Sequence, residues 1–480
     1  MTSRIRVLAA LGVAVALTAT ACTDPPAILT DAPPDTAPRD DLDAGRSDPV
    51  IDPLYPEIGH ADIDVLHYQL DLEYDPAQRE LRGWATLTIR PVETADDLSL
   101  DFSDALKVTE VLADGETVSD YEQEQWDLYV ATPVVADETM TLAIAYSGTP
   151  RPIDAPSHRG DMTEGIGASI GPEGNLWSFQ EPYGALTWYP SNDHPSDEAL
   201  YDFAITVPDG YAGVASGTFM GVEDNTYRWS SSDPVASYLA TIAVDRYTMT
   251  EMEGPSGLPI TLWNTPDYPA FDPILERTPE LIAWIEERYG PYPFDSAGIV
   301  IVGGMSAMET QQMVTFSGGF ANMGESEYVT GVVVHELVHH WFGNTVTPKD
   351  WTGLWISEGA ATYVEQLWQI DQGNVEEKAV VDAWRIEDEE LRQTYGPPGD
   401  PDPAAFAASN SYYCVALMLY ELRDEIGGAE AVDELLAAWV AEHLNQNVTR
   451  ADFTAFVNEH TGKDLTAFID AWLDSPTTPR

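Results

Sequence analysis

His335-Glu336-Leu337-Val338-His339 and, after eighteen further residues, Glu358 form the stretch of sequence that decides the fold. An α-helix turns about 100° per residue, so side chains four residues apart share one face, about 6 Å apart along the axis. His335 and His339 can therefore bind the same metal ion. Glu336 lies one step round the helix, beside the ion, where it suits a general base. Glu358 is the natural third ligand, and the fourth position stays open, as in a catalytic rather than a structural zinc site.

The surrounding sequence supports two helices that carry this site. The apolar run 325–334 leads into the motif, Gly343 stands where a C-terminal cap would end the first helix, and 355–363 resembles a second helix start. A zinc pattern with a third histidine fits worse, because its ligand position is Thr345 and its required glycine is Phe342. We therefore expect one Zn²⁺ per chain, held by His335, His339 and Glu358.

The first residues resemble an export signal. Arg4 and Arg6 precede an apolar stretch from Val7 to Thr20 that is too short to span a bilayer comfortably. The stretch ends in Ala19-Thr20-Ala21-Cys22, which resembles a bacterial lipobox whose cysteine is acylated; ordinary cleavage after Ala21 is the alternative. We expect a signal peptide over residues 1–21, lipidation of Cys22 and an extracytoplasmic, lipid-anchored protein, or else a secreted one.

The amino-acid composition limits which kinds of partner the chain can bind. Residues 22–53 are rich in proline, aspartate and alanine and bury little, which predicts a disordered tether. If Cys22 is lipidated, Cys414 has no cysteine partner for a disulfide. With 81 acidic and 22 basic residues the chain repels nucleic acid and anionic lipid. We therefore expect no nucleic-acid partner, membrane contact only through the lipid anchor, and no obligate protein partner.

The spacing of apolar residues in the folded part changes once along the chain, from a strand-like to a helical period. Short runs such as 68–74 and 85–89 alternate apolar and polar residues and are separated by turns, which predicts an antiparallel β domain over 54–252. From residue 253 onward the pattern is mainly helical, with one strong strand at 298–302. The fold class expected is α+β with two domains, the second (253–480) carrying the zinc motif.

Several blocks resemble the M1 family of zinc aminopeptidases, the gluzincin group that includes leukotriene A4 hydrolase and aminopeptidase N. The resemblance implies a saddle-like β domain followed by a thermolysin-like catalytic domain, and an enzyme that removes residues from peptides with a free N-terminus. It covers essentially all of the folded chain. The blocks are His335–Asn344, Val346–Trp351, Leu354–Gly359, Tyr289–Phe294, Glu181–Gly184, Trp188–Pro195 and the C-terminal Asp464–Leu473.

The resemblance also assigns substrate contacts. By position, Glu309 in Ser306-Ala307-Met308-Glu309-Thr310 would bind the substrate's α-ammonium, and Glu181 would contact the same amine. Ala307 and Met308 would contact the substrate more weakly, along a stretch that resembles an edge strand open to a peptide. Ser306 and Thr310 depart from the family's glycine and asparagine, which affects the contacts to the substrate backbone rather than the amine-binding acids.

A tyrosine hydroxyl near a helix start completes the implied site. Of the adjacent pair, Tyr412 is favoured over Tyr413 as the oxyanion stabiliser, since adjacent helical residues diverge by about 100°. His340 points off the ligand face and is expected to be structural. The predicted activity is that of a zinc aminopeptidase with Glu336 as the base. The alternatives are a zinc endopeptidase or epoxide hydrolase on the same scaffold, or a catalytically inactive surface-binding protein.

Overall fold

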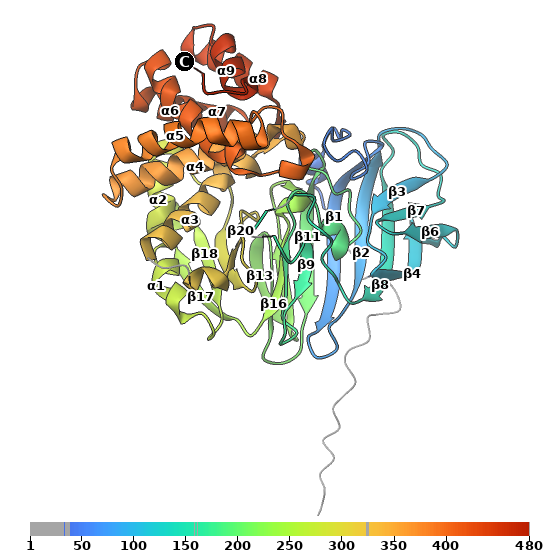
Figure 1. Cartoon of the computed structure of the whole chain (residues 1–480). Coiled ribbons are helices and arrows are strands. Elements are labelled where there is room, and N and C mark those ends of the chain that lie inside the picture. Colours follow the sequence, from blue (N-terminus) through green and yellow to red (C-terminus); the bar gives the residue numbers. More distant parts are fainter. Residues whose placement is uncertain (1–32, 34–38, 158, 161, 323–325, 480) are drawn as a thin grey trace, which may run out of the picture.

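A computed structural model of the chain describes residues 33, 39–157, 159–160, 162–322 and 326–479. The predicted signal peptide, Cys22 and the start of the tether lie outside these residues. The sheets of an N-terminal domain lie beside a catalytic domain whose later helices gather at one end of the molecule (Figure 1). This two-domain α+β architecture is the one expected from the sequence.

The N-terminal domain is built on one large sheet with the order β13-β14-β11-β1-β2-β8-β4-β5, and β15 pairs with β11. The long β1 (Ile63–Asp75) runs antiparallel to β2 (Glu80–Pro91) and parallel to β11 (Glu198–Thr206). Apolar side chains at alternate positions of β1 are buried, as the period-2 pattern predicts. The other strands are β4 (Leu106–Ala113), β5 (Glu116–Thr117), β8 (Met140–Gly148), β13 (Thr218–Glu223), β14 (Thr226–Ser230) and β15 (Val235–Ala236).

Two smaller sheets complete this domain. One has the order β12-β16-β10-β9 and the other β3-β7-β6. The chain leaves the first of them through a buried segment, residues 180–197, that includes Glu181. Their strands are β3 (Leu98–Asp101), β6 (Tyr121–Glu124), β7 (Asp127–Val130), β9 (Gly167–Ile170), β10 (Leu176–Phe179), β12 (Ala212–Ala215) and β16 (Ile242–Asp245).

The tether prediction was wrong for residues 39–53, which pack against both domains. Ser47 donates from its hydroxyl to the Glu198 carbonyl at 3.1 Å. Asp52 is buried and accepts the Trp351 backbone N–H at 2.8 Å, which joins this segment to the catalytic domain. The segment is held by short polar side chains and backbone groups rather than by apolar burial, so a composition argument based on hydrophobicity does not detect it.

The catalytic domain begins earlier than expected, and its main sheet has five strands, where the sequence indicated one strong strand and an edge strand. β17 (Thr248–Glu253) pairs with β18 (Pro259–Asn264) in a sheet of order β17-β18-β19-β21-β20, so the boundary falls before residue 248 rather than at 253. The glycines and proline at 253–257, which resemble a domain boundary, form the turn that joins β17 to β18. The other three strands are β19 (Ala297–Val302), β20 (Ala307–Met308) and β21 (Val314–Ser317).

The helices cover this sheet and continue beyond it. α3 packs against α4, and α4 also packs against α6. The described helices are α1 (Asp272–Leu275), α2 (Thr278–Tyr289), α3 (Ser326–His339), α4 (Leu354–Asp371), α5 (Glu377–Tyr395), α6 (Val415–Ile426), α7 (Ala429–Glu442), α8 (Arg450–Thr461) and α9 (Thr466–Asp474). A short parallel pair, β22 (Val346–Pro348) and β23 (Gln446–Val448), ties the start of α4 to the C-terminal helices.

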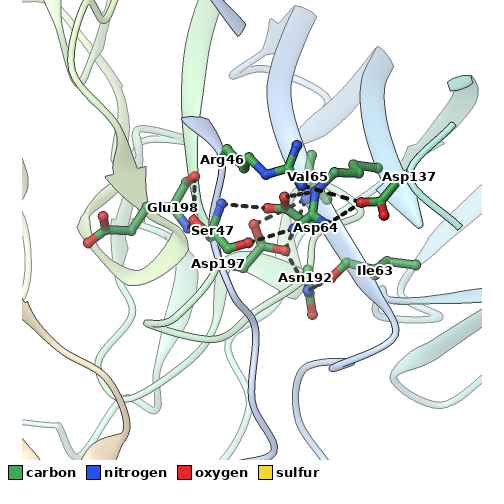
Figure 2. A network of polar contacts seen from close by, with 10 residues as sticks. Arg46, Ser47, Ile63, Asp64, Val65, Asp137, Asn192, Asp197 and Glu198 are labelled. Carbon is green, nitrogen blue, oxygen red and sulfur yellow. Dashed lines mark hydrogen bonds and ion pairs between the residues drawn. The ribbon is translucent and has the colours of Figure 1, made fainter. Parts of the chain in front are cut away.

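Buried acids near the N-terminal segment have unusual protonation behaviour. Figure 2 shows the carboxylates of Asp64 and Asp197 close together beside Ser47 and Asn192, whereas the carboxylate of Glu198 points away from them. Burial, and then the neighbouring Asp64, raises the pKa of Asp197 well above its ordinary value. Burial likewise raises the pKa of Glu198 to about 7. Each group is therefore protonated in the folded chain at a pH where the unfolded chain has already lost the proton.

We expect Glu198→Gln to reduce the loss of stability that occurs as the pH rises. A raised folded pKa contributes stability that is complete below the unfolded pKa and is lost as pH rises through about 7. Between about pH 5 and pH 8, the melting temperature of the variant relative to the parent should rise by on the order of 3 °C. Thermal melts of the zinc-loaded parent and variant measure this difference. Both proteins have the same metal ligands, so the pH dependence of metal binding cancels when their melting temperatures are subtracted. A difference that stays constant with pH would contradict the protonation of Glu198.

Candidate active site

Two helices bring the three predicted metal ligands together. His335 and His339 lie on the last turns of α3, and Glu358 lies on the second turn of α4. The Nε2 atoms of the two histidines are 3.2 and 3.4 Å from Oε2 of Glu358. Two ligand atoms on a tetrahedral zinc ion, each about 2.1 Å from it, are about 3.4 Å apart. The two imidazoles and one carboxylate therefore fit a zinc ion in both type and spacing.

The other nitrogen of each histidine is also engaged. His339 Nδ1 lies 3.0 Å from the Phe342 carbonyl, which leaves Nε2 free for a metal. His335 Nδ1 lies 3.5 Å from a carboxylate oxygen of Glu365, which is two turns beyond Glu358 on the same helix. After His339 the helix unwinds into a π-type turn, and Gly343 adopts a φ of +127° that other residues rarely adopt. This turn brings the Phe342 carbonyl back to His339.

Glu336 lies in this buried site without being one of the three ligands. One of its carboxylate oxygens lies within 4.8 Å of a ring nitrogen of His339 and of a carboxylate oxygen of Glu309. The pKa of Glu336 is raised to about 8: burial raises it most, the charges of His335 and His339 oppose this, and the carboxylates of Glu309 and Glu358 add to it. A divalent cation at the three ligands would lower this pKa. A carboxyl whose pKa lies near neutrality suits proton transfer in both directions.

The two acids assigned to the substrate amine lie next to the ligands. Oxygens of Glu181, Glu309 and Glu358 are all within 4.8 Å of one another, and all three side chains are buried. Glu309 directly follows β20, which is the edge strand of its sheet as expected. The Asn344 amide donates to the Glu309 carbonyl at 2.8 Å, so the turn after α3 holds this segment beside the zinc ligands.

Tyr412 and Tyr413 both border the site but differ in their surroundings. The Tyr412 ring stacks on the His335 ring with centroids 6.1 Å apart, whereas Tyr413 is 37% exposed. Both lie in a π-type turn that packs on α4. Gly359 permits that approach, because a Cβ there would lie 2.2 Å from Val415 Cγ1. The structure thus places Tyr412 against a ligand, which is the position the sequence argument favoured.

The predicted residues meet in one cavity of about 210 Å³ between the domains. Met308 is an exception. It does not line the cavity, and its buried sulfur accepts the Gln180 backbone N–H at 3.4 Å, so the weaker prediction of a substrate contact is not supported for its side chain. Successive residues of a strand face opposite sides, which explains why only one of the pair 307–308 lines the cavity. Lining the cavity are Glu181, Ala307, Glu309, His335, Glu336, His339, Glu358, Tyr412 and Tyr413.

Three further residues belong to the site or its support. Arg159 lines the cavity and pairs with Glu181, and no sequence motif marks it. Glu365 lies seven residues after Glu358, a helical spacing that could have identified it. His340 is structural, as expected. Burial lowers its pKa to about 3, and its ring nitrogens lie 2.7 Å from the Tyr292 hydroxyl and 3.4 Å from the Thr310 carbonyl.

Comparisons with known proteins agree with this geometry. Residues 65–239 match the family model "Peptidase M1 N-terminal domain", and residues 274–472 match "Peptidase family M1 domain". Aminopeptidase B of Rattus norvegicus is 25% identical over 473 residues, which cover 87% of this chain and 70% of that protein. Aminopeptidase N of Streptomyces lividans is 23% identical over 443 residues, covering 85% of this chain and 50% of that one.

Solved structures show the same likeness. The M1 zinc metallopeptidase from Deinococcus radiodurans superposes with a TM-score of 0.78 at 26% identity, covering 90% of this chain and 98% of that one. Two helices that bring two histidines and a glutamate together next to a β domain, with further carboxylates beside these three ligands, define a zinc metallopeptidase. The two matched family models account for most of the folded chain, and the chain belongs to peptidase family M1.

Proposed function

We propose that this protein is a zinc-dependent aminopeptidase that hydrolyses the first peptide bond of peptides with a free α-amino group. The observation that carries the proposal is the position of Glu309 and Glu181, whose oxygens lie within 4.8 Å of the ligand Glu358. An ammonium bound there by charge-assisted hydrogen bonds leaves the first carbonyl as the one within reach of the metal site. A mutant of the Deinococcus relative has been solved bound to a Tyr-Ser-Ala substrate, which fits a peptide in this cavity.

The chemistry follows from the positions of the side chains. A zinc ion held by His335, His339 and Glu358 would supply a Lewis acid that polarises the carbonyl and acidifies water. Glu336 removes the proton from the attacking water and returns it to the leaving amine. The Tyr412 hydroxyl donates a hydrogen bond to the developing oxyanion.

Hydrolysis of aminoacyl-naphthylamides, compared with their N-acetylated versions, tests this function. We expect cleavage of the free-amine substrates only, and loss of that cleavage when a chelator removes the metal. Cleavage of the acetylated versions would favour the endopeptidase alternative. If the zinc-loaded protein cleaves neither version, the aminopeptidase proposal is wrong.

Glu309→Gln tests the amine site itself. The variant keeps the shape of the side chain but loses the negative charge, so kcat/KM should fall by about 10- to 100-fold while the zinc content stays unchanged. The matched control is Glu251→Gln, which removes an exposed acid outside the cavity and should leave the rate unaltered. Parallel loss of zinc and activity in Glu309→Gln would contradict its role in binding the amine.

We further propose that the chain is exported and held at a membrane by a lipid on Cys22. The support is the sequence of residues 1–22, with its basic start, short apolar stretch and lipobox-like end. No helix in the part of the chain that the structure describes is long and apolar enough to cross a bilayer. Mass spectrometry of the mature N-terminus tests the proposal: an unmodified mature chain would leave the secreted alternative.

A further inference from the structure

The two oxygens of Glu181 have different surroundings. Oε2 accepts a hydrogen bond from Nη1 of Arg159 at 2.9 Å, and the side chains are 4% and 17% exposed. Oε1 is buried and has no hydrogen-bond partner among the described residues. A buried carboxylate oxygen without a partner is costly, so it indicates a place where a donor binds. That donor is available in the proposed reaction as the substrate's ammonium group.

The backbone beside Glu181 is firmly held, but its carboxylate depends on Arg159. The preceding Gln180 is fully buried, and its amide donates to the carbonyls of Ser237 and Ala240 at 2.6 and 2.7 Å. The carboxylates of Glu309 and Glu358 lie beside that of Glu181, and their negative charges repel a negative charge on it. The guanidinium opposes that repulsion and is positioned to fix the direction of both oxygens.

Arg159 reaches this position from a stretch between Ile153 and Ile166 in which none of the described residues belongs to a helix or strand. The segment is closed by an isolated bridge between Ile153 and Ile166. Arg159 lines both the zinc-site cavity and an adjoining cavity of about 500 Å³. Among the described residues that line either cavity, it is the only lysine or arginine. Basic residues are scarce in this chain, with 22 against 81 acidic ones, so a cation beside the amine-binding Glu181 indicates a role at that acid.

We propose that Arg159 is a positioning residue for substrate recognition: it holds Oε2 of Glu181 so that Oε1 faces the incoming ammonium. It acts through Glu181 and does not itself take part in the chemistry. The ammonium contact is made in both the bound substrate and the transition state, so its loss weakens binding more than turnover. This inference rests on the proposed aminopeptidase function.

The test compares Arg159→Gln, Arg159→Lys and Glu181→Gln in the zinc-loaded protein. For free-amine naphthylamides we expect Arg159→Gln to raise KM by about tenfold or more while kcat stays within about threefold. Arg159→Lys keeps the charge and should recover part of the loss. Combining Arg159→Gln with Glu181→Gln should add little to Glu181→Gln alone, because the two residues act as one unit. Melting temperature and zinc content establish that each variant is folded and loaded.

A binding measurement separates this inference from the proposed function. Calorimetric titration with leucinamide and N-acetyl-leucinamide, carried out in the Glu336→Gln background so that leucinamide is not hydrolysed, should show that Arg159→Gln weakens binding of the free amine only. A parent protein that binds leucinamide but cleaves no peptide would overturn the proposed function. The role of Arg159 would then be decided by the binding measurements. An unchanged KM and leucinamide affinity in Arg159→Gln, additive effects in the double variant, or a parent that does not bind leucinamide would overturn the inference.

Discussion

Glu336→Gln should reduce kcat by about 10³-fold and leave the metal bound, within the range of roughly 10²–10⁴ that general acid–base catalysis contributes. Glutamine matches the shape of glutamate but cannot accept the proton from water or return it to the leaving amine. The side chain is buried next to the ligands without being one of them, so its replacement removes proton transfer and spares the three metal donors. The expected result is an intact site without a base.

Steady-state kinetics on the best free-amine substrate, with zinc measured by atomic absorption, checks this expectation. KM should change little, because Glu336 takes no part in binding the ammonium. The exposed-acid variant Glu251→Gln serves again as the charge-matched control. A Glu336→Gln protein that keeps a tenth or more of the parent kcat, or that loses its zinc, would show that the residue is not the base.

Tyr412→Phe should lower kcat by about 10²- to 10³-fold, the usual effect of removing one donor to an oxyanion. Tyr412 stacks on the ligand His335, which places its ring at the edge of the metal site. Phenylalanine preserves the stacking and removes only the hydroxyl group. Because the oxyanion exists only in the transition state, KM should remain close to that of the parent.

The neighbouring tyrosine provides the matched control. Tyr413 lines the same cavity but is partly exposed, and burial of its hydroxyl raises its pKa to about 12. Tyr413→Phe should therefore keep nearly full activity. The opposite outcome, a large loss in Tyr413→Phe and a small one in Tyr412→Phe, would assign the oxyanion contact to Tyr413. Equal small losses would mean that neither hydroxyl stabilises the transition state.

Local geometry explains why much of the site can be predicted from the sequence. The helical repeat places His335 and His339 on one face, and the carboxylate of Glu358 lies where the motif spacing predicts, 3.2 Å from His335. The alternation of apolar residues likewise identifies the β domain, because a strand buried on one face must alternate. The resemblance to family M1 added the positions of Glu181 and Glu309, which no local periodicity predicts.

Other features depend on partners that are distant in the sequence. Apart from the expected edge strand, the extra strands of the catalytic sheet escaped detection because short strands such as β21 have too few residues to show a period. The residues before Leu54 were expected to be disordered, yet Asp52 bonds to Trp351, 299 positions away. A hydrogen bond of this kind leaves no trace in composition, since it depends on where the other domain lies.

The sequence by itself determined the metal ligands, the base, the class of fold and the family, because each rests on spacing within one element or on a motif. Only the tertiary structure decided how the acids around the metal are held. It pairs Arg159 with Glu181 across a loop and a sheet, and it leaves the other oxygen of Glu181 without a partner among the described residues. Charge pairs of this kind form between segments that meet only when the chain folds, so no local pattern encodes them.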